Sequence, residues 1–583
     1  MKKFVLFLLI IALFSVSLVQ AQEVYQLPLL AVHEIGDDLV GSSAELLLEL
    51  RPGSGRVFLE TRPLTKLDTQ ISTRFANDVA CNQFNLPCDK FDFIYTINAQ
   101  SNIIGGPSAG AALAALTTVA VLDLPYDNNI AVTGTINSGG TVGPVGGVKE
   151  KLEAAANAEM KTVLIPAGAT AYKFLDNTTI DLLEFAVNNL TITAEEVKDL
   201  DDVLFILTGE MLRPEVADLT ENGVYTEIME GLQSSLCERS ERIKAKILEE
   251  EVTITSNASE AIKERQTEAA AALAQKDFYS AASFCFNANI QLKTAYYNQI
   301  PIPLNAFNSL GKRVDALERK VSSEEITTIS DLQTLMIVKE RLQDVREQII
   351  AVTESGLNNE EKANILAYAE ERYYSALSWM QFFEMDGKNV VINDELLAAS
   401  CSQKIFEAEE RHQYARLFLG DFPLINIQEK IISAQNADTA KEYALCLITA
   451  SQAKADANAV LSSFGVREEI FNEFLEGKQQ AVEREIARNS AEGVFPILGY
   501  SYYQYANSLS EDDFTPLVYY EYALEMSDLS IYFPEKESRI VNLRNVELSR
   551  WLIFVEGLVV GIIIGIIIFS LFFRYYRKKY SRK

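Results

Sequence analysis

Residues 105–114 read GGPSAGAALA and lie between a polar, turn-rich segment and a long run of small apolar residues. The glycines and the proline keep 105–107 outside regular structure, whereas 109–122 has the alanine and leucine content of a buried helix. Ser108 therefore falls at or near the N-terminus of that helix. Two interpretations are open: the Ser108 hydroxyl caps the helix, as serine often does, or it is the nucleophile of an enzyme.

A serine nucleophile needs a base, which is most often a histidine. The chain has two histidines. His412 lies in the charged stretch EAEERHQYAR and is predicted to be a surface residue, while His33 lies in the first predicted strand region, AVHEIGDDL. A Ser-His-Asp triad would have to use His33, and this is the interpretation we favour least.

The other established base is a lysine that burial keeps neutral, because desolvation lowers the pKa of an ammonium group. Residues 135–166 read TINSGGTVGPVGGVKEKLEAAANAEMKTVLIP, which predicts a glycine-rich hairpin, an alanine-rich helix and a strand. Lys149 and Lys151 lie at the start of this helix, where the backbone dipole disfavours a cation. Each lysine could instead be a solvated surface charge, and this is our interpretation of Lys149.

Taken in order, GGPSAG, the TG of AVTG, GPVGGVKEKL and KTVLIP strongly resemble the proteolytic domain of Lon proteases. In that family the serine lies in a Gly-Pro-Ser-Ala-Gly loop, and the lysine is the second one in a Gly-Gly-hydrophobic-Lys-Glu-Lys-Leu run. The resemblance implies that Ser108 is the nucleophile, that Lys151 is the base and that Thr133 helps to orient this dyad. It extends more loosely over about residues 26–210.

The resemblance also implies an acyl-transfer mechanism, in which backbone N–H groups around Ser108 and Ala109 stabilise the oxyanion at a helix N-terminus. Two features depart from the family. Lon proteins usually carry an acidic residue where this chain has Gly105, and they usually carry an ATPase module, whereas this sequence has no GxxxxGK[ST] phosphate loop. We therefore expect an ATP-independent serine endopeptidase that hydrolyses unfolded or loosely folded polypeptides.

The expected cofactor content is none, and no metal site is expected, because the sequence has no CxxC and no Cys/His cluster. A homo-oligomer is expected only by analogy, since Lon protease domains commonly assemble as rings. No nucleic-acid partner is expected, because the net charge is −29 and an acidic surface repels phosphate backbones. The alternative function is a non-catalytic surface scaffold or chaperone-like protein that binds partners through its helical domain.

Both ends of the chain carry targeting features. Residues 1–21 show two lysines, an apolar core and small residues at a plausible cleavage site, which is the pattern of a signal peptide; an uncleaved anchor is the alternative. Residues 551–573 are long and apolar enough for one transmembrane helix, and the basic tail 574–583 follows. The positive-inside rule then predicts a single-pass protein of the cell membrane with an extracytoplasmic main body and a cytoplasmic tail.

The chain changes character near residue 212. Residues 22–211 are predicted to form an α+β Lon-like proteolytic domain, and 212–550 a largely α-helical domain that is rich in Ala, Glu, Leu, Gln and Tyr. The helical domain is either an irregular bundle, which we prefer, or a set of tetratricopeptide (TPR)-like hairpins, since 273–288 and 509–524 share a shape. Strands are predicted at 29–32, 57–60, 93–97, 130–135 and 162–165.

The six cysteines agree with an exported protein. Cys81 and Cys88 close a short loop ahead of the serine segment, so we predict a disulfide between them. The other four lie in helical sequence and either pair or remain buried thiols; they are Cys237, Cys285, Cys401 and Cys446.

Overall fold

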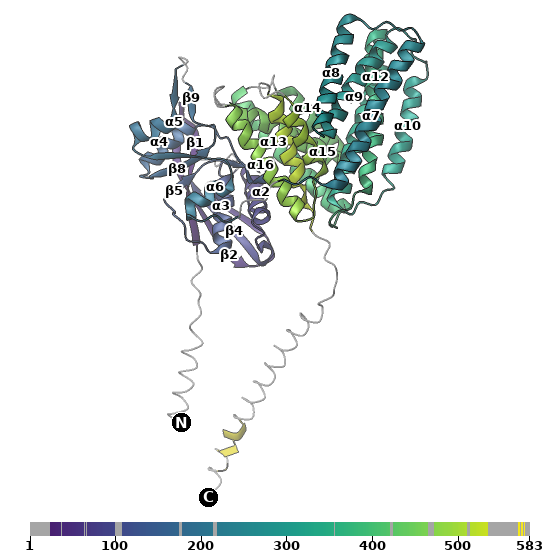
Figure 1. Ribbon diagram of the computed structural model, residues 1–583. Helices are drawn as coiled ribbons and strands as arrows, with labels where there is room; N and C mark the ends of the chain where they lie inside the picture. Colours follow the sequence, from purple (N-terminus) through teal and green to yellow (C-terminus); the bar gives the residue numbers. More distant parts are fainter. Residues whose placement is uncertain are drawn as a thin grey trace. The chain divides into compact units, whose positions relative to one another are not determined.

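The computed structural model describes residues 24–35, 38–62, 64–65, 67–99, 108–173, 178–213, 219–354, 356–419, 424–463, 471–509, 514–534, 569–571, 573–574 and 577. The predicted signal peptide and most of the predicted membrane helix lie outside these residues. Within the described part of the chain, no helix combines the length and the apolar character that a bilayer crossing requires. The described residues up to Pro534 belong to one compact unit (Figure 1), which holds every element discussed below.

The first sheet has four strands in the order β1-β2-β4-β3. β1 and β2 form a long antiparallel hairpin, β4 pairs antiparallel with β2, and β3 pairs parallel with β4. Alternate strand residues such as Leu46, Leu48 and Tyr95 are fully buried, which gives the sheet one apolar face. The strands are β1 (Val24–Ile35), β2 (Asp38–Pro52), β3 (Val57–Arg62) and β4 (Phe91–Ala99).

Helix α3 (Gly110–Leu122) is the central element of this α/β part. Its sequence is almost entirely Ala, Leu, Val and Thr, and every residue from Gly110 to Ala120 is buried. It packs against α2 (Leu67–Gln83), against β1 and β2 of the first sheet, and against α6 (Leu200–Thr208). A helix that is apolar on all sides is stable only inside a core, so α3 fixes the position of the turn that precedes it.

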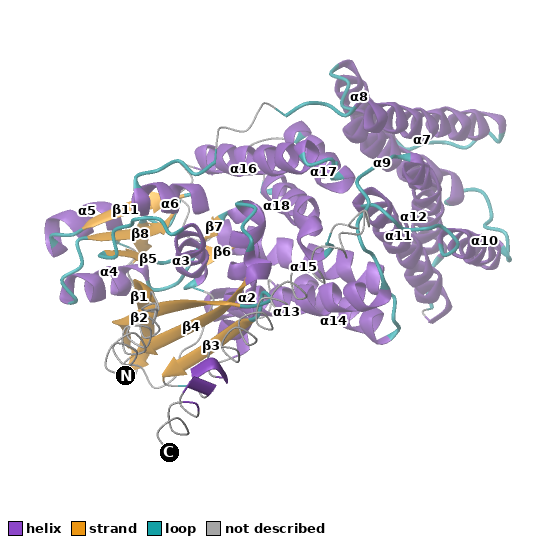
Figure 2. Ribbon diagram, turned by 90° about the horizontal axis from the view of Figure 1, so that it is seen from below, coloured by secondary structure: helices purple, strands orange, loops and turns teal. Residues whose placement is uncertain are grey.

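The α/β part also contains a parallel three-stranded sheet of order β11-β8-β5 and two short antiparallel pairs, β6-β7 and β9-β10. Helix α4 lies between the β6-β7 hairpin and β8 in the chain. Figure 2 shows that the strands are confined to this first part of the unit. The elements are β5 (Ile130–Val132), β6 (Thr135–Ile136), β7 (Val142–Gly143), α4 (Val148–Asn157), β8 (Thr162–Pro166), β9 (Ala171–Lys173), β10 (Thr179–Asp181), α5 (Leu182–Phe185) and β11 (Thr193–Val197).

From residue 223 to 532 the described chain is helical. The helices range from 12 residues in α17 to 27 in α7, so they form an irregular bundle rather than hairpins of one repeated length. They are α7 (Gly223–Glu249), α8 (Ser256–Ala274), α9 (Phe278–Tyr297), α10 (Ala306–Val321), α11 (Ile329–Glu354), α12 (Asn359–Trp379), α13 (Asp394–Leu419), α14 (Ile425–Thr439), α15 (Tyr443–Ser463), α16 (Phe471–Ala491), α17 (Ile497–Ser508) and α18 (Thr515–Ser527).

The two segments of similar shape in this half both lie at helix junctions. One spans the α8–α9 turn, where the Asp277 side chain caps α9, and the other runs from the end of α17 into α18. Their aromatic side chains are linked through Tyr505 of α17: the ring centres of Tyr279 and Tyr505 are 6.1 Å apart, and those of Tyr505 and Tyr519 are 4.6 Å apart. The shared pattern therefore reflects two halves of one aromatic core.

All five predicted strand segments lie within or across observed strands, and 130–135 is divided into β5 and β6 by Thr133 and Gly134. The longest strand, β2, was not predicted. Its AELLLEL stretch, 44–50, consists of residues that favour helices. It becomes a strand because β1 and β4 pair with it on both sides, and such pairing overrides local propensity.

All six cysteines are paired. The predicted disulfide between Cys81 and Cys88 is confirmed. Cys237 pairs with Cys285 and joins α7 to α9, and Cys401 pairs with Cys446 and joins α13 to α15. Each bridge therefore ties together elements of one part of the unit.

We expect loss of the Cys237–Cys285 disulfide to lower the free energy of unfolding more than loss of the Cys81–Cys88 disulfide. The chain-entropy argument gives about 4 kcal/mol for Cys237–Cys285, whose cysteines are 48 residues apart, and about 2 kcal/mol for Cys81–Cys88, which are 7 apart. Double serine variants of each pair should rank in this order in urea unfolding midpoints. A higher midpoint for the variant that lacks Cys237–Cys285 would contradict the argument from loop length.

Candidate active site

Ser108 lies in the turn immediately before α3 and is half-buried. The helix begins at Gly110, Ala109 occupies its N-cap position, and no side chain caps it. The capping interpretation of Ser108 finds no support, because no hydrogen bond joins its hydroxyl to the first turn among the described residues. Capping does not explain a serine at this position.

Two backbone hydrogen bonds join the serine turn to the strand segment after β5. The Gly134 amide donates to the Ser108 carbonyl at 3.0 Å, and the Ala111 amide donates to the Gly134 carbonyl at 3.0 Å. Only glycine permits this approach, since a Cβ at Gly134 would lie 2.5 Å from a methyl group of Val142. The glycine after Thr133 thus places the start of α3 against Thr133.

Lys151 lies in α4, and its side chain is buried to 1% exposure. Its Nζ donates a hydrogen bond to Oγ1 of Thr133 at 2.9 Å. Thr133 is itself 1% exposed, and its amide donates to the Leu164 carbonyl of β8 at 3.0 Å. The structure therefore brings the predicted residues Lys151 and Thr133 together, and it bonds the backbone of Ser108 to the residue that follows Thr133.

Burial lowers the pKa of the Lys151 ammonium group to about 7. An ordinary lysine titrates near 10.4, so this side chain carries a neutral amine in a large fraction of molecules at neutral pH. Among the described residues no carboxylate forms an ion pair with Lys151 that would restore the charge. A neutral amine in a water-poor site can accept a proton from a serine hydroxyl.

Lys149 is not the solvated charge that we predicted. Its side chain is 17% exposed, its Nζ donates to Oε1 of Glu153 at 2.6 Å, and it lies over the rings of Tyr172 and Phe185. Burial lowers the pKa of Lys149, but the hydrogen bond and charge of Glu153 outweigh burial, and the pKa is raised. Lys149 therefore stays a cation and is unsuited to act as a base.

The prediction that His412 is a surface residue is also wrong. His412 lies in α13 and is only 5% exposed, because this helix packs against α14 and α15. His33 lies in β1 opposite Val40 of β2, and its Nδ1 is buried without a hydrogen-bond partner among the described residues. No hydrogen bond within the described ranges joins either histidine to Ser108.

Sequence reasoning missed the residues that hold the tip of the β6-β7 hairpin. The Ser138 hydroxyl donates to Oε1 of Glu525 in α18 at 3.0 Å, and the Gly139 amide donates to Asp528 at 3.3 Å. Arg411 of α13 donates to the Ile136 carbonyl at 3.1 Å. Ser138 and Glu525 are 387 residues apart in the chain, so no local pattern could have revealed this contact.

Glu525 at this tip belongs to a buried ion cluster. Lys404 lies 2.6 Å from Glu525 and 3.1 Å from Glu407, and Lys454 lies 2.9 Å from each of these carboxylates. Burial raises the pKa of Glu407, but the two lysines outweigh burial and lower it to about 2. The cluster therefore stays ionised and holds Ser138 with fixed charges.

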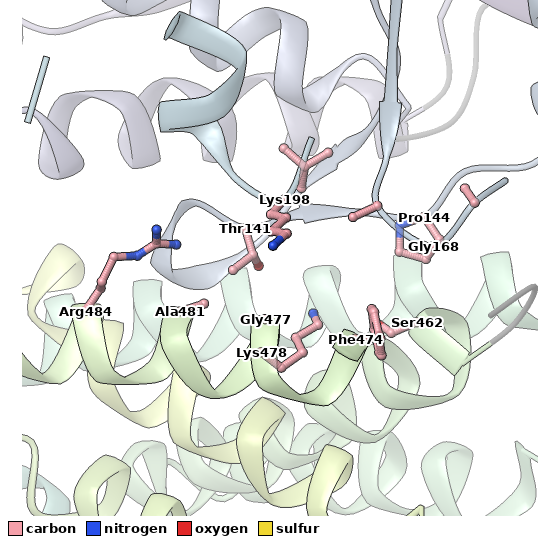
Figure 3. Close-up of a pocket in the computed structure, with 13 residues that line it drawn as sticks. Thr141, Pro144, Gly168, Lys198, Ser462, Phe474, Gly477, Lys478, Ala481 and Arg484 are labelled. Carbon is pink, nitrogen blue, oxygen red and sulfur yellow. The ribbon is translucent and has the colours of Figure 1, made fainter. Parts of the chain in front are cut away.

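A small cleft of about 60 Å³ opens beside the same hairpin (Figure 3). Thr141, Pro144 and Gly168 line it on the α/β side, and α16 lines it on the helical side. Lys198 and Lys478 reach into it from opposite sides. Residues 144–147 lead directly into α4, so the helical part supplies one wall next to the segment that carries Lys151.

Known proteins resemble the part of the chain that carries this site. Residues 100–206 match the family model of the Lon protease (S16) C-terminal proteolytic domain. This stretch of the chain is therefore similar to a Lon-type proteolytic domain. It is 33% identical over 187 residues to the Lon protease of Methanosphaera stadtmanae, which covers 31% of this chain and 21% of that protein.

Bacterial Lon proteases match over shorter stretches. Lon protease 2 of Bacillus subtilis is 45% identical over 76 residues, which is 13% of this chain and 14% of that protein. The Lon protease of Neorickettsia sennetsu is 33% identical over 150 residues, which is 24% of this chain and 17% of that protein. The chain thus covers about a fifth or less of the length of these relatives, and the matches support a serine peptidase.

We expect Lys151→Met to stabilise the folded protein, by an amount that shrinks as the pH rises. Because the folded pKa of about 7 lies below the unfolded value, the folded chain binds fewer protons between these values. Wild-type stability should therefore rise with pH from about 7 to about 10, and the methionine variant should gain about 3 kcal/mol at pH 8 and little at pH 10. Urea unfolding at both pH values measures this gain.

The matched control for that experiment is Lys149→Met. It removes a cation that is already paired with Glu153, so it should give no gain at pH 8. An equal gain for Lys151→Met at pH 8 and at pH 10 would show that the pKa of Lys151 is not lowered.

Proposed function

We propose that this protein is a serine endopeptidase that uses a Ser108–Lys151 dyad. The observation that carries the proposal is the buried Lys151 amine in a stretch similar to a Lon-type proteolytic domain: its pKa is lowered, and it donates a hydrogen bond to the uncharged Thr133 hydroxyl, which suits a base. The backbone bond from Gly134 to Ser108 supports the pairing, because it fixes the serine turn to the residue next to Thr133.

In the proposed mechanism the neutral Lys151 amine accepts the Ser108 proton as the hydroxyl oxygen attacks a peptide carbonyl. Backbone N–H groups of Ser108 and Ala109, at the N-terminal end of α3, stabilise the oxyanion. Lys151 then gives its proton to the leaving amine, and an acyl-enzyme remains. Water attacks the ester while Lys151 again acts as base, which releases the acid and restores the serine. Thr133 positions the amine throughout.

We propose unfolded or loosely folded polypeptides as substrates, cleaved without ATP. The sequence has no phosphate loop that would power unfolding, so stably folded proteins should be poor substrates. A homo-oligomer is proposed by analogy with ring-forming Lon proteases alone.

We further propose that the main body is extracytoplasmic and is anchored in the cell membrane by residues 551–573. The three disulfides support an oxidising compartment, where such bonds persist. The apolar stretch and the basic tail 574–583 support the orientation, because positive residues remain on the cytoplasmic side.

The dyad is tested with casein as an unfolded substrate, without nucleotide. Ser108→Ala and Lys151→Ala should each lower the rate by several orders of magnitude, and the double variant should be little worse than either. Lys151→Arg should also be inactive, because a guanidinium cannot act as a base. Thr133→Val should fall between wild type and these variants, since it keeps the shape and loses the hydroxyl. Lys149→Ala is the control and should retain most activity.

The pH profile gives a second readout of the same mechanism. Activity should rise with pH through about 7, as the Lys151 amine loses its proton. An active Lys151→Ala variant combined with an inactive His33→Ala variant would show that the base is not Lys151. Intact activity in Ser108→Ala would favour the non-catalytic alternative for Ser108.

Protease protection tests the proposed topology. Protease added to intact cells should digest the main body and leave a C-terminal tag protected, because the tag follows the basic tail. Permeabilised cells provide the control, in which the tag should be lost. Digestion of the tag in intact cells would reverse the orientation.

A further inference from the structure

A cavity of about 200 Å³ lies inside the helical part, away from the dyad. It lies between α7, α9, α11, α12, α17 and α18. Space of this size admits on the order of ten water molecules, and hence a small organic ligand. Its apolar wall consists of Leu232, Leu236, Ala282, Phe286 and Trp379.

Aromatic rings form a box around this cavity. Tyr279 lies edge-on to Trp379 with ring centres 6.2 Å apart, and edge-on to Tyr505 at 6.1 Å. Tyr505 in turn lies edge-on to Tyr519 at 4.6 Å. The phenol groups of Tyr505 and Tyr519 have no hydrogen-bond partner among the described residues, and burial raises the pKa of Tyr505 to about 12. The box therefore combines flat apolar walls with neutral hydroxyl donors.

Two arginines line the same cavity. Arg341 is 8% exposed, donates from Nε to Ser375 at 2.9 Å and from Nη1 to Glu340 at 3.3 Å, and lies over the Trp379 ring. Arg372 donates from Nε to Asp344 at 2.6 Å and from Nη2 to Glu340 at 2.8 Å. One terminal nitrogen of each, Nη2 of Arg341 and Nη1 of Arg372, bonds to no described residue. Each guanidinium thus keeps a donor that a ligand can use.

The charges of the lining residues favour an anionic ligand over a cationic one. The chain has 81 acidic and 52 basic residues, yet the described residues that line this cavity include no Asp or Glu. Glu340 and Asp344 balance the arginines from positions that do not line it. A cation would meet two guanidinium groups and no carboxylate, although aromatic boxes often hold cations. A carboxylate would meet guanidinium and phenol donors in a site of low dielectric.

We propose that this cavity binds a carboxylate that carries an aromatic or branched apolar group, about the size of one amino-acid residue. Trp379, Tyr279 and Phe286 take the apolar group, while Arg341 and Arg372 take the carboxylate. A free aromatic acid and the C-terminal residue of a peptide share this chemistry. The proposal does not depend on the proposed peptidase activity, because no residue of the dyad contributes to the cavity.

Tryptophan fluorescence of the full-length protein tests the proposal. The chain has two tryptophans, so Trp551→Phe leaves Trp379 as the reporter, and Ser108→Ala in the same chain prevents turnover of peptides. The probes are N-acetyl-phenylalanine, a short peptide ending in phenylalanine, and the C-terminal amide of each. Both acids should change the emission saturably, with Kd values at least tenfold lower than those of the amides. Saturation by the peptide acid alone would identify a peptide C-terminus as the ligand.

Substitutions in the lining test whether the acids bind in this cavity. Arg341→Met should weaken binding of the acids at least tenfold, and Ala282→Leu should do the same by filling the cavity while leaving both arginine networks intact. Arg346→Met is the matched control on α11, since Arg346 pairs with Asp315 and Glu318 outside the cavity, and it should bind as the parent does. Equal binding of acids and amides to the parent protein, or no binding at all, would overturn the proposal without any variant. Unchanged binding in a folded Ala282→Leu protein would also overturn it.

Discussion

The chemistry of the candidate site depends on one buried lysine amine, which has no carboxylate partner in the part of the chain that the structure describes. Lys404 is buried as deeply as Lys151, yet burial and pairing act differently on the two. Around Lys404 the charges of Glu407 and Glu525 outweigh burial and raise the pKa, whereas Lys151 has the Thr133 hydroxyl as partner and burial lowers its pKa to about 7. The neighbours of a lysine, and not its depth, therefore decide whether it is a structural cation or a base.

The two kinds of lysine are found near opposite ends of one segment, the β6-β7 hairpin and the start of α4. The β6-β7 hairpin leads from Thr133 to α4, which carries Lys151, and its tip at Ser138 is held by the ion cluster of Lys404, Lys454, Glu407 and Glu525. Fixed charges suit the tip, because a ladder of charge-assisted hydrogen bonds resists displacement. A neutral amine suits the other end, at Lys151, because in the proposed mechanism this amine gains and loses a proton. The helical part thus supports the segment that links Thr133 to Lys151.

Local sequence patterns identified what local backbone geometry determines. The glycine-rich turns, the apolar run of α3 and the lysines at the start of α4 were visible because turns and helix starts select particular residues over a few positions. Three kinds of feature were not predictable in this way. β2 depends on strands on both of its sides, Glu153 and two aromatic rings surround Lys149, and the Ser138–Glu525 contact joins distant parts of the chain. Each of these follows from tertiary packing, which a local pattern does not encode.

The choice between lysine and arginine follows from the same physics. A buried cation must either lose its proton or be balanced nearby, and in this acidic chain both solutions occur. Lys151 approaches the first solution, which arginine cannot use because a guanidinium does not lose its proton in proteins. Arg341 and Arg372 use the second, with Glu340 and Asp344 behind them, and so keep positive donors facing a cavity at any ordinary pH. A lysine therefore suits the position where a proton must move, and arginines suit a position where an anion must be held.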